Sequence, residues 1–154
     1  MVTIDLFADI GCPWCYVGER RLKRALESRG VRATVRWHPY ELQRGLPREG
    51  LPWSEIVEKK FGGWERARAM FQHVRNAGAE EGIQFDFERV ASAPNTRDAH
   101  RVMLLAQEKG RLWEAAEAIF AAYFTEGRDV GSVDVLAEVA DSAGVDAAEV
   151  REML

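Results

Sequence analysis

The sequence has no long apolar run and no apolar leader. No stretch approaches the ~20 apolar residues that a membrane-spanning helix needs. Met1 runs directly into a predicted strand rather than into a basic and then apolar signal segment. We therefore expect no membrane partner and a cytoplasmic location, where a reducing environment keeps cysteines mainly as thiols.

An excess of positive charge is also missing. The formal net charge is −4 and the isoelectric point is near 5.5, so the composition does not favour a nucleic acid or an anionic membrane as partner. Hydrophobic residues make up 47% of the chain and charged residues 30%, which is ordinary for a globular protein that buries a core. The chain has no internal repeats or low-complexity segments.

Cysteine is scarce, because the chain has only Cys12 and Cys15, with three histidines. A structural zinc site needs four ligands, usually as two closely spaced pairs. His38, His73 and His100 are 35 and 27 residues apart, so no second pair exists and we expect no metal site. Two inert thiols are another interpretation, since free cysteine often packs like a small apolar residue.

The position of the two cysteines favours redox chemistry over inert packing. They form the motif Cys12-Pro13-Trp14-Cys15, which joins an apolar strand, Val2–Ala8, to an amphipathic helix. A CxxC beside a βαβ pattern is typical of thioredoxin-like proteins. The first thiol lies at the helix N-terminus, where a cysteine pKa can fall from ~8.5 to between ~3.5 and ~7.5. The motif therefore predicts thiol–disulfide exchange.

Residues 1–38 are predicted to form a βαβ unit. The strand Val2–Ala8 is almost continuously apolar, as expected for a strand that is buried on both faces. A helix follows and ends at Gly30, and apolar residues then alternate with polar ones from Val31 to His38. The two strands should be parallel, with a right-handed crossover.

Residues 39–154 are predicted to form a second, mostly helical domain. After a loop broken by proline and glycine, six apolar patterns with helical spacing follow in series. We interpret the large aromatic residues of these patterns as core rather than as a binding platform. These residues are Trp53, Trp64, Trp113 and Phe120.

Four segments also carry a family resemblance: residues 9–22, with the sequence DIGCPWCYVGERRL, residues 35–42, residues 95–101 and residues 121–130. They resemble the DsbA family of thiol–disulfide oxidoreductases, in particular its cytoplasmic FrnE-like branch, and the resemblance spans essentially the whole chain. It implies an α/β fold, a thioredoxin-like βαβ half with a large all-helical inserted domain. It implies no cofactor other than the dithiol–disulfide couple itself.

The two cysteines are expected to have different roles. Cys12, at the exposed end of the helix, should attack the substrate disulfide, and Cys15, one turn further in and more buried, should resolve the mixed disulfide. Pro13 and Trp14 should shape the ring that the pair closes.

The resemblance also places polar residues of the helical domain at the cleft. Asn95, Thr96 and His100 match a family motif and are expected to face the cysteines, and His38, at the end of the second strand, could face the same cleft. The alternatives are that Asn95 only caps its helix and that His100 is a surface or core histidine.

Two other functions stay open. A related branch resembles 2-hydroxychromene-2-carboxylate isomerases and kappa-class glutathione transferases, which typically have serine at the first motif position and act on glutathione or its adducts. Cysteine at both positions favours two-thiol redox chemistry here, with glutathione as a candidate reductant and a protein or small-molecule thiol or disulfide as substrate. The third function is that of a non-catalytic, chaperone-like binding protein.

The sequence departs from the family at its end. The family implies a closing strand–strand–helix segment that begins at a cis-proline beside the cysteines, and the sequence has no counterpart of it. The first strand should then have an unpaired edge, which is a template for pairing with another strand. The C-terminal ββα part is therefore expected to be absent from this chain. We expect the chain to be a homodimer or a fragment of a longer chain.

Overall fold

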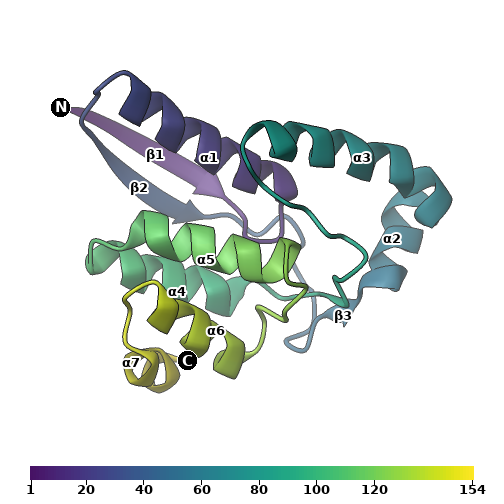
Figure 1. The fold of residues 1–154 in the computed structure, drawn as a ribbon. Coiled ribbons are helices and arrows are strands. Elements are labelled where there is room, and N and C mark those ends of the chain that lie inside the picture. Colours follow the sequence, from purple (N-terminus) through teal and green to yellow (C-terminus); the bar gives the residue numbers. More distant parts are fainter.

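The computed structural model describes residues 1–154 as seven helices and four strands (Figure 1). In chain order they are β1 (Val2–Ala8), α1 (Pro13–Ser28), β2 (Ala33–Pro39), β3 (Leu51–Pro52), α2 (Trp53–Phe61), α3 (Trp64–Glu80), β4 (Ser92–Ala93), α4 (Arg97–Glu108), α5 (Leu112–Phe124), α6 (Val133–Ser142) and α7 (Ala147–Met153). The six helical patterns predicted after residue 39 are all confirmed. None of the helices is both long enough and apolar enough to cross a membrane.

β1 and β2 form a parallel two-stranded sheet, which confirms the predicted βαβ unit. Val2 is paired with Ala33 and Ala8 with Pro39. β2 begins at Ala33 rather than at Val31, because the Val31 N–H still closes the end of α1 by donating to the Leu26 carbonyl at 3.0 Å. The short strands β3 and β4 form a separate antiparallel pair.

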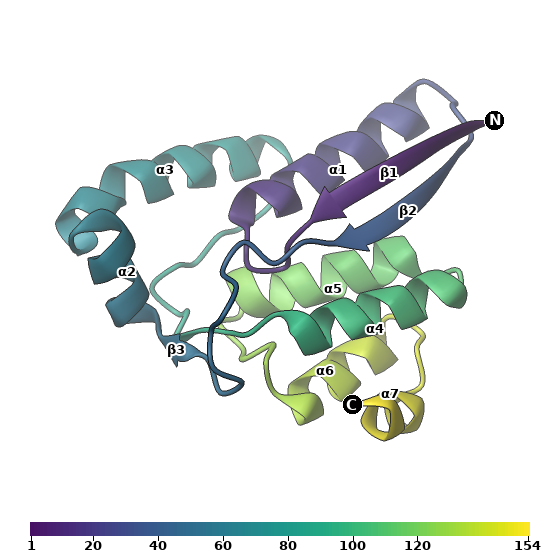
Figure 2. The same cartoon turned by 180° about the vertical axis from the view of Figure 1, so that it is seen from behind.

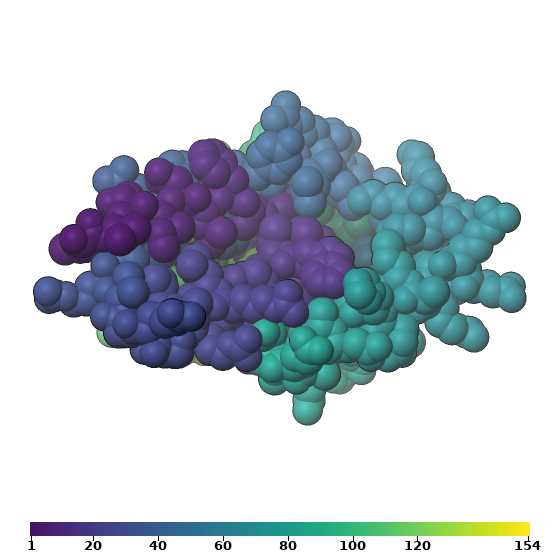
Figure 3. All heavy atoms as spheres, turned by 90° about the horizontal axis from the view of Figure 1, so that it is seen from above, coloured from purple at the N-terminus to yellow at the C-terminus, as the bar shows by residue number.

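The helices surround this sheet unevenly. α4 and α5 run along one side of the sheet, with α6 and α7 beyond them (Figure 2). α3 lies beside α1 at the opposite end of the molecule from the N-terminus, as the view from above shows (Figure 3). The loops that follow β1 and β2 lie in the middle of the molecule, between the sheet and α2 (Figure 2).

One hydrophobic core of 33 buried residues includes side chains from both parts of the chain. Tyr16 of α1 stacks on Phe120 of α5, with ring centroids 4.9 Å apart. The division into residues 1–38 and 39–154 as separate domains stays a prediction, but the packing between them is continuous.

The predicted burial of the helical aromatic residues is confirmed only in part. Phe120 is completely buried, but Trp64 is 40% exposed. Trp64 begins α3 and contacts Phe71, with ring centroids 5.7 Å apart. Trp64 is the first residue of α3, so no preceding turn of that helix covers its ring, and its helical spacing overestimates its burial.

The prediction that β1 is buried on both faces is wrong. Phe7 is 67% exposed and Val2 52% exposed. β1 pairs only with β2, so its other edge has no strand beside it. The helices cover one face of the sheet, while Phe7 on the other face stacks only on His38.

Candidate active site

The two cysteines lie at the turn between β1 and α1. Cys12 is the N-cap of α1 with extended backbone angles, φ −107° and ψ 114°, and Pro13 is the first helical residue. The Cys12 N–H donates to the Asp9 carbonyl, and the Cys15 N–H donates to the Cys12 carbonyl, both at 3.1 Å. The missing N–H of Pro13 costs nothing at this position, because the first helical N–H groups have no partner within the helix.

Both thiols are free and half-buried. The two cysteines therefore fall in the same burial class, although Cys15 was expected to be more buried than Cys12. Their hydrogen bonding distinguishes them. The Cys12 sulfur has the Cys15 thiol and the backbone N–H groups of Cys15 and Trp14, at the start of α1, as its neighbouring donors. Together these donors lower the pKa of Cys12 to about 6, against the opposing effects of burial and of the Asp9 charge.

The same contact acts in the opposite direction on Cys15. Its proton is held in the hydrogen bond to Cys12, and burial adds to this effect, so the pKa of Cys15 is raised above its ordinary value. At neutral pH the arrangement is therefore a thiolate on Cys12 next to a thiol on Cys15. A thiolate is the nucleophile in disulfide exchange.

A cavity of about 150 Å³ opens beside Cys12 and Pro13. Its walls come from the loop after β2, from α2, from the segment before α4 and from α5. The contributing side chains include Leu42, Leu46, Trp53, Pro94, Thr96 and Tyr123. Trp14 lies outside this cavity, 41% exposed, with its ring 5.4 Å from that of His73.

Asp9 is a buried carboxylate in the same wall, only 4% exposed. It accepts hydrogen bonds from the Gly11 N–H at 3.3 Å, from the Leu42 N–H at 2.8 Å and from His100 Nε2 at 3.1 Å. Burial alone would raise the pKa of Asp9, but the hydrogen bonds from His100, Leu42 and Thr96 outweigh it and hold the pKa below its ordinary value. Asp9 is therefore ionised beside the thiolate.

His100 connects Asp9 to the sheet. Trp37 Nε1, which can only donate, lies 3.2 Å from His100 Nδ1. Nδ1 must then be the acceptor, so the ring proton is on Nε2 and is donated to Asp9. The ring is neutral in this arrangement, and only 3% of His100 is exposed.

The structure brings some of the predicted site residues together and separates others. Thr96 lines the cavity with Cys12. His100 lies behind the cavity wall, in contact with Asp9. Asn95 does not line this cavity; it donates to the Leu46 carbonyl at 2.9 Å and accepts from the Arg97 N–H at 3.1 Å. The N-cap of α4 is Thr96 rather than Asn95.

His38 is not part of the cavity wall. Its ring stacks on Phe7 and its Nε2 lies 2.7 Å from Asp5 Oδ1, on the exposed face of the sheet. Side chains alternate along a strand, and Trp37, the neighbour of His38, is the residue that points to the core.

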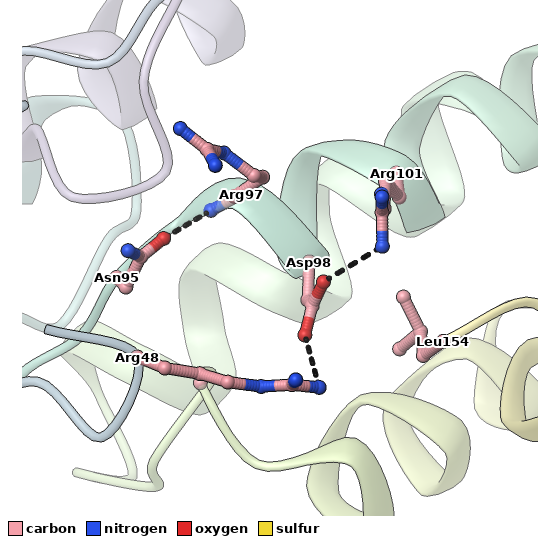
Figure 4. Close-up of a pocket in the computed structure, with 7 residues that line it drawn as sticks. Arg48, Asn95, Arg97, Asp98, Arg101 and Leu154 are labelled. Atoms are coloured by element: carbon pink, nitrogen blue, oxygen red, sulfur yellow. Dashed lines mark hydrogen bonds and ion pairs between the residues drawn. The ribbon is translucent and has the colours of Figure 1, made fainter.

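A larger and more polar cavity of about 280 Å³ contains no cysteine. Figure 4 shows it at the start of α4, where Arg48 and Arg101 both pair with Asp98 and Leu154 lies opposite. Asn95 belongs to this cavity, together with Arg97. The structure has no group of three or more histidine, cysteine or acidic side chains that could hold a metal ion.

Sequence analysis missed Asp9 and Trp37 as residues of the site. Asp9 directly follows a parallel strand, at the strand end where loops form sites in α/β proteins. That position was a usable signal. Trp37 had no such signal, because its role depends on a contact with His100, 63 residues away.

Comparisons with known proteins agree with this geometry. A family model described as DSBA-like thioredoxin domain matches residues 3–154. The uncharacterized protein YwbO of Bacillus subtilis is 29% identical over 99% of this chain and 72% of its own length. A crystal structure of a probable DsbA oxidoreductase from Streptomyces coelicolor is 30% identical, with a TM-score of 0.87 over 99% of this chain and 67% of that one.

Two more distant structures share the fold. The cytosolic disulfide reductase DsbM of Pseudomonas aeruginosa, solved with GSH, is 22% identical with a TM-score of 0.67, over 99% of this chain and 71% of that one. A 2-hydroxychromene-2-carboxylate isomerase is 16% identical with a TM-score of 0.68, over 98% of this chain and 70% of that one. At these identities the similarity concerns the fold alone.

Proposed function

The chain belongs to the DSBA-like thioredoxin domain family, and on that basis we propose that it is a thiol–disulfide oxidoreductase that reacts through Cys12 and Cys15. The observation that carries the proposal is the placement of the pair: Cys12 is the N-cap of α1 and lines an open cavity, with the second free thiol, Cys15, on the same turn of the helix. Cys12 has a pKa of about 6, and Cys15 holds its proton in a hydrogen bond to Cys12.

The proposed reaction has two exchange steps. The Cys12 thiolate attacks one sulfur of a substrate disulfide, which forms a mixed disulfide and releases the other substrate sulfur as a thiolate. Cys15 then loses its proton to solvent and attacks the Cys12 sulfur, which closes the Cys12–Cys15 disulfide and releases the second substrate thiolate. Two electrons pass from the protein to the substrate, and the reverse sequence oxidises a dithiol.

Each residue around the pair has a role in this proposal. The helix N-terminus stabilises the Cys12 thiolate through the N–H groups of Trp14 and Cys15. The substrate disulfide approaches Cys12 from the cavity side, where Pro13, Leu42 and Thr96 offer a mixed polar and apolar wall. The substrate class is a thiol or disulfide, and glutathione is the candidate small-molecule reductant.

Reduction of insulin disulfides tests the proposal. We expect Cys12→Ser to abolish activity, and Cys15→Ser to abolish turnover while accumulating a covalent adduct on Cys12 that dithiothreitol releases. Ser28→Ala, an exposed change at the far end of the same helix, is the matched control and should retain full activity. Reduction by Cys12→Ser equal to that of the control would refute the role of Cys12, and a wild type that reduces no insulin disulfide would refute the redox function and leave the chaperone-like one.

A glutathione-dependent isomerase or transferase is the second candidate. Its support is the shared fold with a 2-hydroxychromene-2-carboxylate isomerase and with a disulfide reductase solved with GSH. Such an enzyme needs one activated thiolate and a glutathione pocket, so Cys15→Ser should retain its activity. Glutathione-dependent turnover that survives this substitution would favour the second candidate over the first.

We also propose a cytosolic location, by analogy with the cytosolic disulfide reductase that shares the fold. Cell fractionation with an antibody to the chain tests this. Recovery of the protein mainly outside the cytosolic fraction would contradict it.

A further inference from the structure

Asp9 introduces a negative charge that forms no ion pair with a lysine or arginine. Its carboxylate is buried in the wall of the cavity that also exposes Cys12, three residues further along the chain. Its hydrogen-bond donors are the Gly11 and Leu42 N–H groups and the His100 ring, and the Thr96 side chain also lowers its pKa. Its only ion-pair contact is His100, and that ring is neutral because Trp37 donates to its other nitrogen.

The position of the carboxylate is rigid. Gly11 and Leu42 bring two loops to it, and His100 and Thr96 bring the start of α4. A carboxylate held by several donors cannot turn away when a second negative charge forms nearby. It therefore acts on the cysteine pair as a fixed charge, in surroundings where screening by water is reduced.

The Asp9 charge interacts differently with the reduced and the oxidised cysteine pair. The reduced pair carries a thiolate on Cys12, while the disulfide carries no charge. A nearby negative charge disfavours the thiolate, and the Asp9 charge does raise the pKa of both Cys12 and Cys15. The reduced state is therefore destabilised relative to the disulfide.

We propose that Asp9 is a positioning residue that sets the redox balance of the cysteine pair, with its negative charge favouring the disulfide and so making the dithiol a stronger reductant. This inference rests on the proposed redox function. In the exchange that measures it, two glutathione molecules reduce the Cys12–Cys15 disulfide. The two electrons leave a thiolate on Cys12 and a thiol on Cys15, one proton is released, and one glutathione disulfide forms.

The other ionisable groups around Cys12 do not replace Asp9 in this role. Tyr123 is buried with a raised pKa, so it is neutral at physiological pH. Lys60 also lines the cavity, but its side chain is exposed to solvent on α2. Cys15 acts on Cys12 in the opposite direction, because its hydrogen bond favours the thiolate. Asp9 is therefore the fixed negative charge among the ionisable groups around Cys12.

The test compares Asp9→Asn with Thr96→Val. Asp9→Asn removes the charge and, because its NH₂ group cannot accept, at least one of the hydrogen bonds that Asp9 accepts. Thr96→Val removes the side-chain hydroxyl that also lowers the pKa of Asp9 and keeps the Asp9 charge, which makes it the matched structural control. Asp9→Ser is a second neutral variant in case Asp9→Asn does not fold, and circular dichroism establishes the fold of each.

Two quantities are measured for each variant: the midpoint of the pH profile of Cys12 alkylation, and the equilibrium with glutathione. Loss of the charge should move the midpoint lower by about one pH unit and shift the equilibrium about tenfold toward the dithiol. Thr96→Val should change the equilibrium by less than about threefold. A folded neutral variant that behaves like wild type, or a Thr96→Val effect as large as that of Asp9→Asn, overturns the inference.

The outcome also separates this inference from the proposed function. If the wild-type pair does not exchange with glutathione or with insulin disulfides, the redox function itself is wrong. If the wild type exchanges and the neutral variants do not differ from it, only the role of Asp9 is wrong.

Discussion

The N-terminal unit and the helical part of the chain bury their apolar side chains to very different degrees. In β1, Phe7 is 67% exposed and Val2 52% exposed. In α5, eight side chains are buried, and Ile119, Phe120 and Phe124 are completely inaccessible. The reactive cysteines belong to the more exposed unit, while the residues that hold the site in place belong largely to the other.

The reactive residues and the residues that hold them in place therefore lie in different parts of the molecule. Cys12 and Cys15 need access to a substrate, so they lie at an open turn between β1 and α1. The contacts that fix this turn come from His100 of α4, which bonds Asp9, and from α5, where Phe120 stacks on Tyr16 and Glu117 pairs with Arg20. We infer that α4 and α5 form the rigid support of the site.

The sharpest way to test the comparison is to remove one aromatic ring from each part. Phe120→Ala should lower the free energy of unfolding by about 3–5 kcal/mol, because the ring is completely buried and its loss leaves a cavity under Tyr16. Phe7→Ala is the matched control and should cost less than about 1 kcal/mol. Urea unfolding measures both, and equal losses would contradict the assignment of support to α5.

A second prediction concerns Glu19, the buried charge between the two parts. Glu19 is 2% exposed, neither carboxyl oxygen has a hydrogen-bond partner, and burial together with the nearby Glu117 raises its pKa to about 7. Because the pKa of Glu19 is higher in the folded than in the unfolded chain, protonation of Glu19 stabilises the fold. This stabilisation is fully present when the pH is below the unfolded-state pKa of ~4.3. It is lost as the pH rises through about 7.

Glu19→Gln should therefore stabilise the protein at pH 8 by roughly 1–3 kcal/mol and much less at pH 5. Glu27→Gln, an exposed change on the same helix, is the control and should have little effect at either pH. Unfolding in urea at the two pH values measures the difference. A gain from Glu19→Gln that is the same at pH 5 and pH 8 would show that Glu19 does not titrate in this range.

A third prediction follows from the cysteine pair. The pKa of Cys12 is lowered to about 6 in the folded, reduced protein, so its thiolate contributes stability above the unfolded value of ~8.5, and this is lost as the pH falls through 6. Reduced wild type should gain on the order of 1–2 kcal/mol between pH 5.5 and 8.5 relative to Cys12→Ser.

Above that range the raised pKa of Cys15 acts in the opposite direction, because deprotonation of Cys15 favours the unfolded chain. The stability difference between wild type and Cys12→Ser should therefore reach a maximum rather than rise steadily. Thermal unfolding of the reduced proteins, from pH 5.5 to above 8.5, measures this stability difference. A flat difference would contradict the thiolate assignment.

The smallest expected effect concerns the open edge of β1. We propose that this edge pairs with another strand, and a second copy of the chain is the occupant to test. Light scattering should show concentration-dependent association, and amide exchange of residues 2–8 should slow as the concentration rises. Thr3→Lys, which places a charge on the exposed face of the edge strand, should weaken association several-fold. A stable monomer with rapidly exchanging β1 amides would contradict the proposal.

The local elements could be predicted because their causes are local. Helical spacing in α2 to α7, the glycine after α1 and the CPWC turn all depend on residues within a few positions of one another. The burial of β1 could not be predicted in the same way. Val2 and Phe7 have the composition of an enclosed strand, but enclosure depends on which elements pack against each face.

The candidate site shows the same division. The sequence by itself determined the motif, its place at a helix N-terminus and the direction in which the helix shifts the pKa of Cys12, because all of these arise within one turn of backbone. Only the tertiary structure decided how the Asp9 charge beside Cys12 is held. Asp9 and His100 are 91 residues apart and meet at 3.1 Å, and the neutral state of His100 depends on Trp37 from the sheet. Contacts between distant residues are set by how β1, β2 and α4 pack together, and no local pattern encodes that packing.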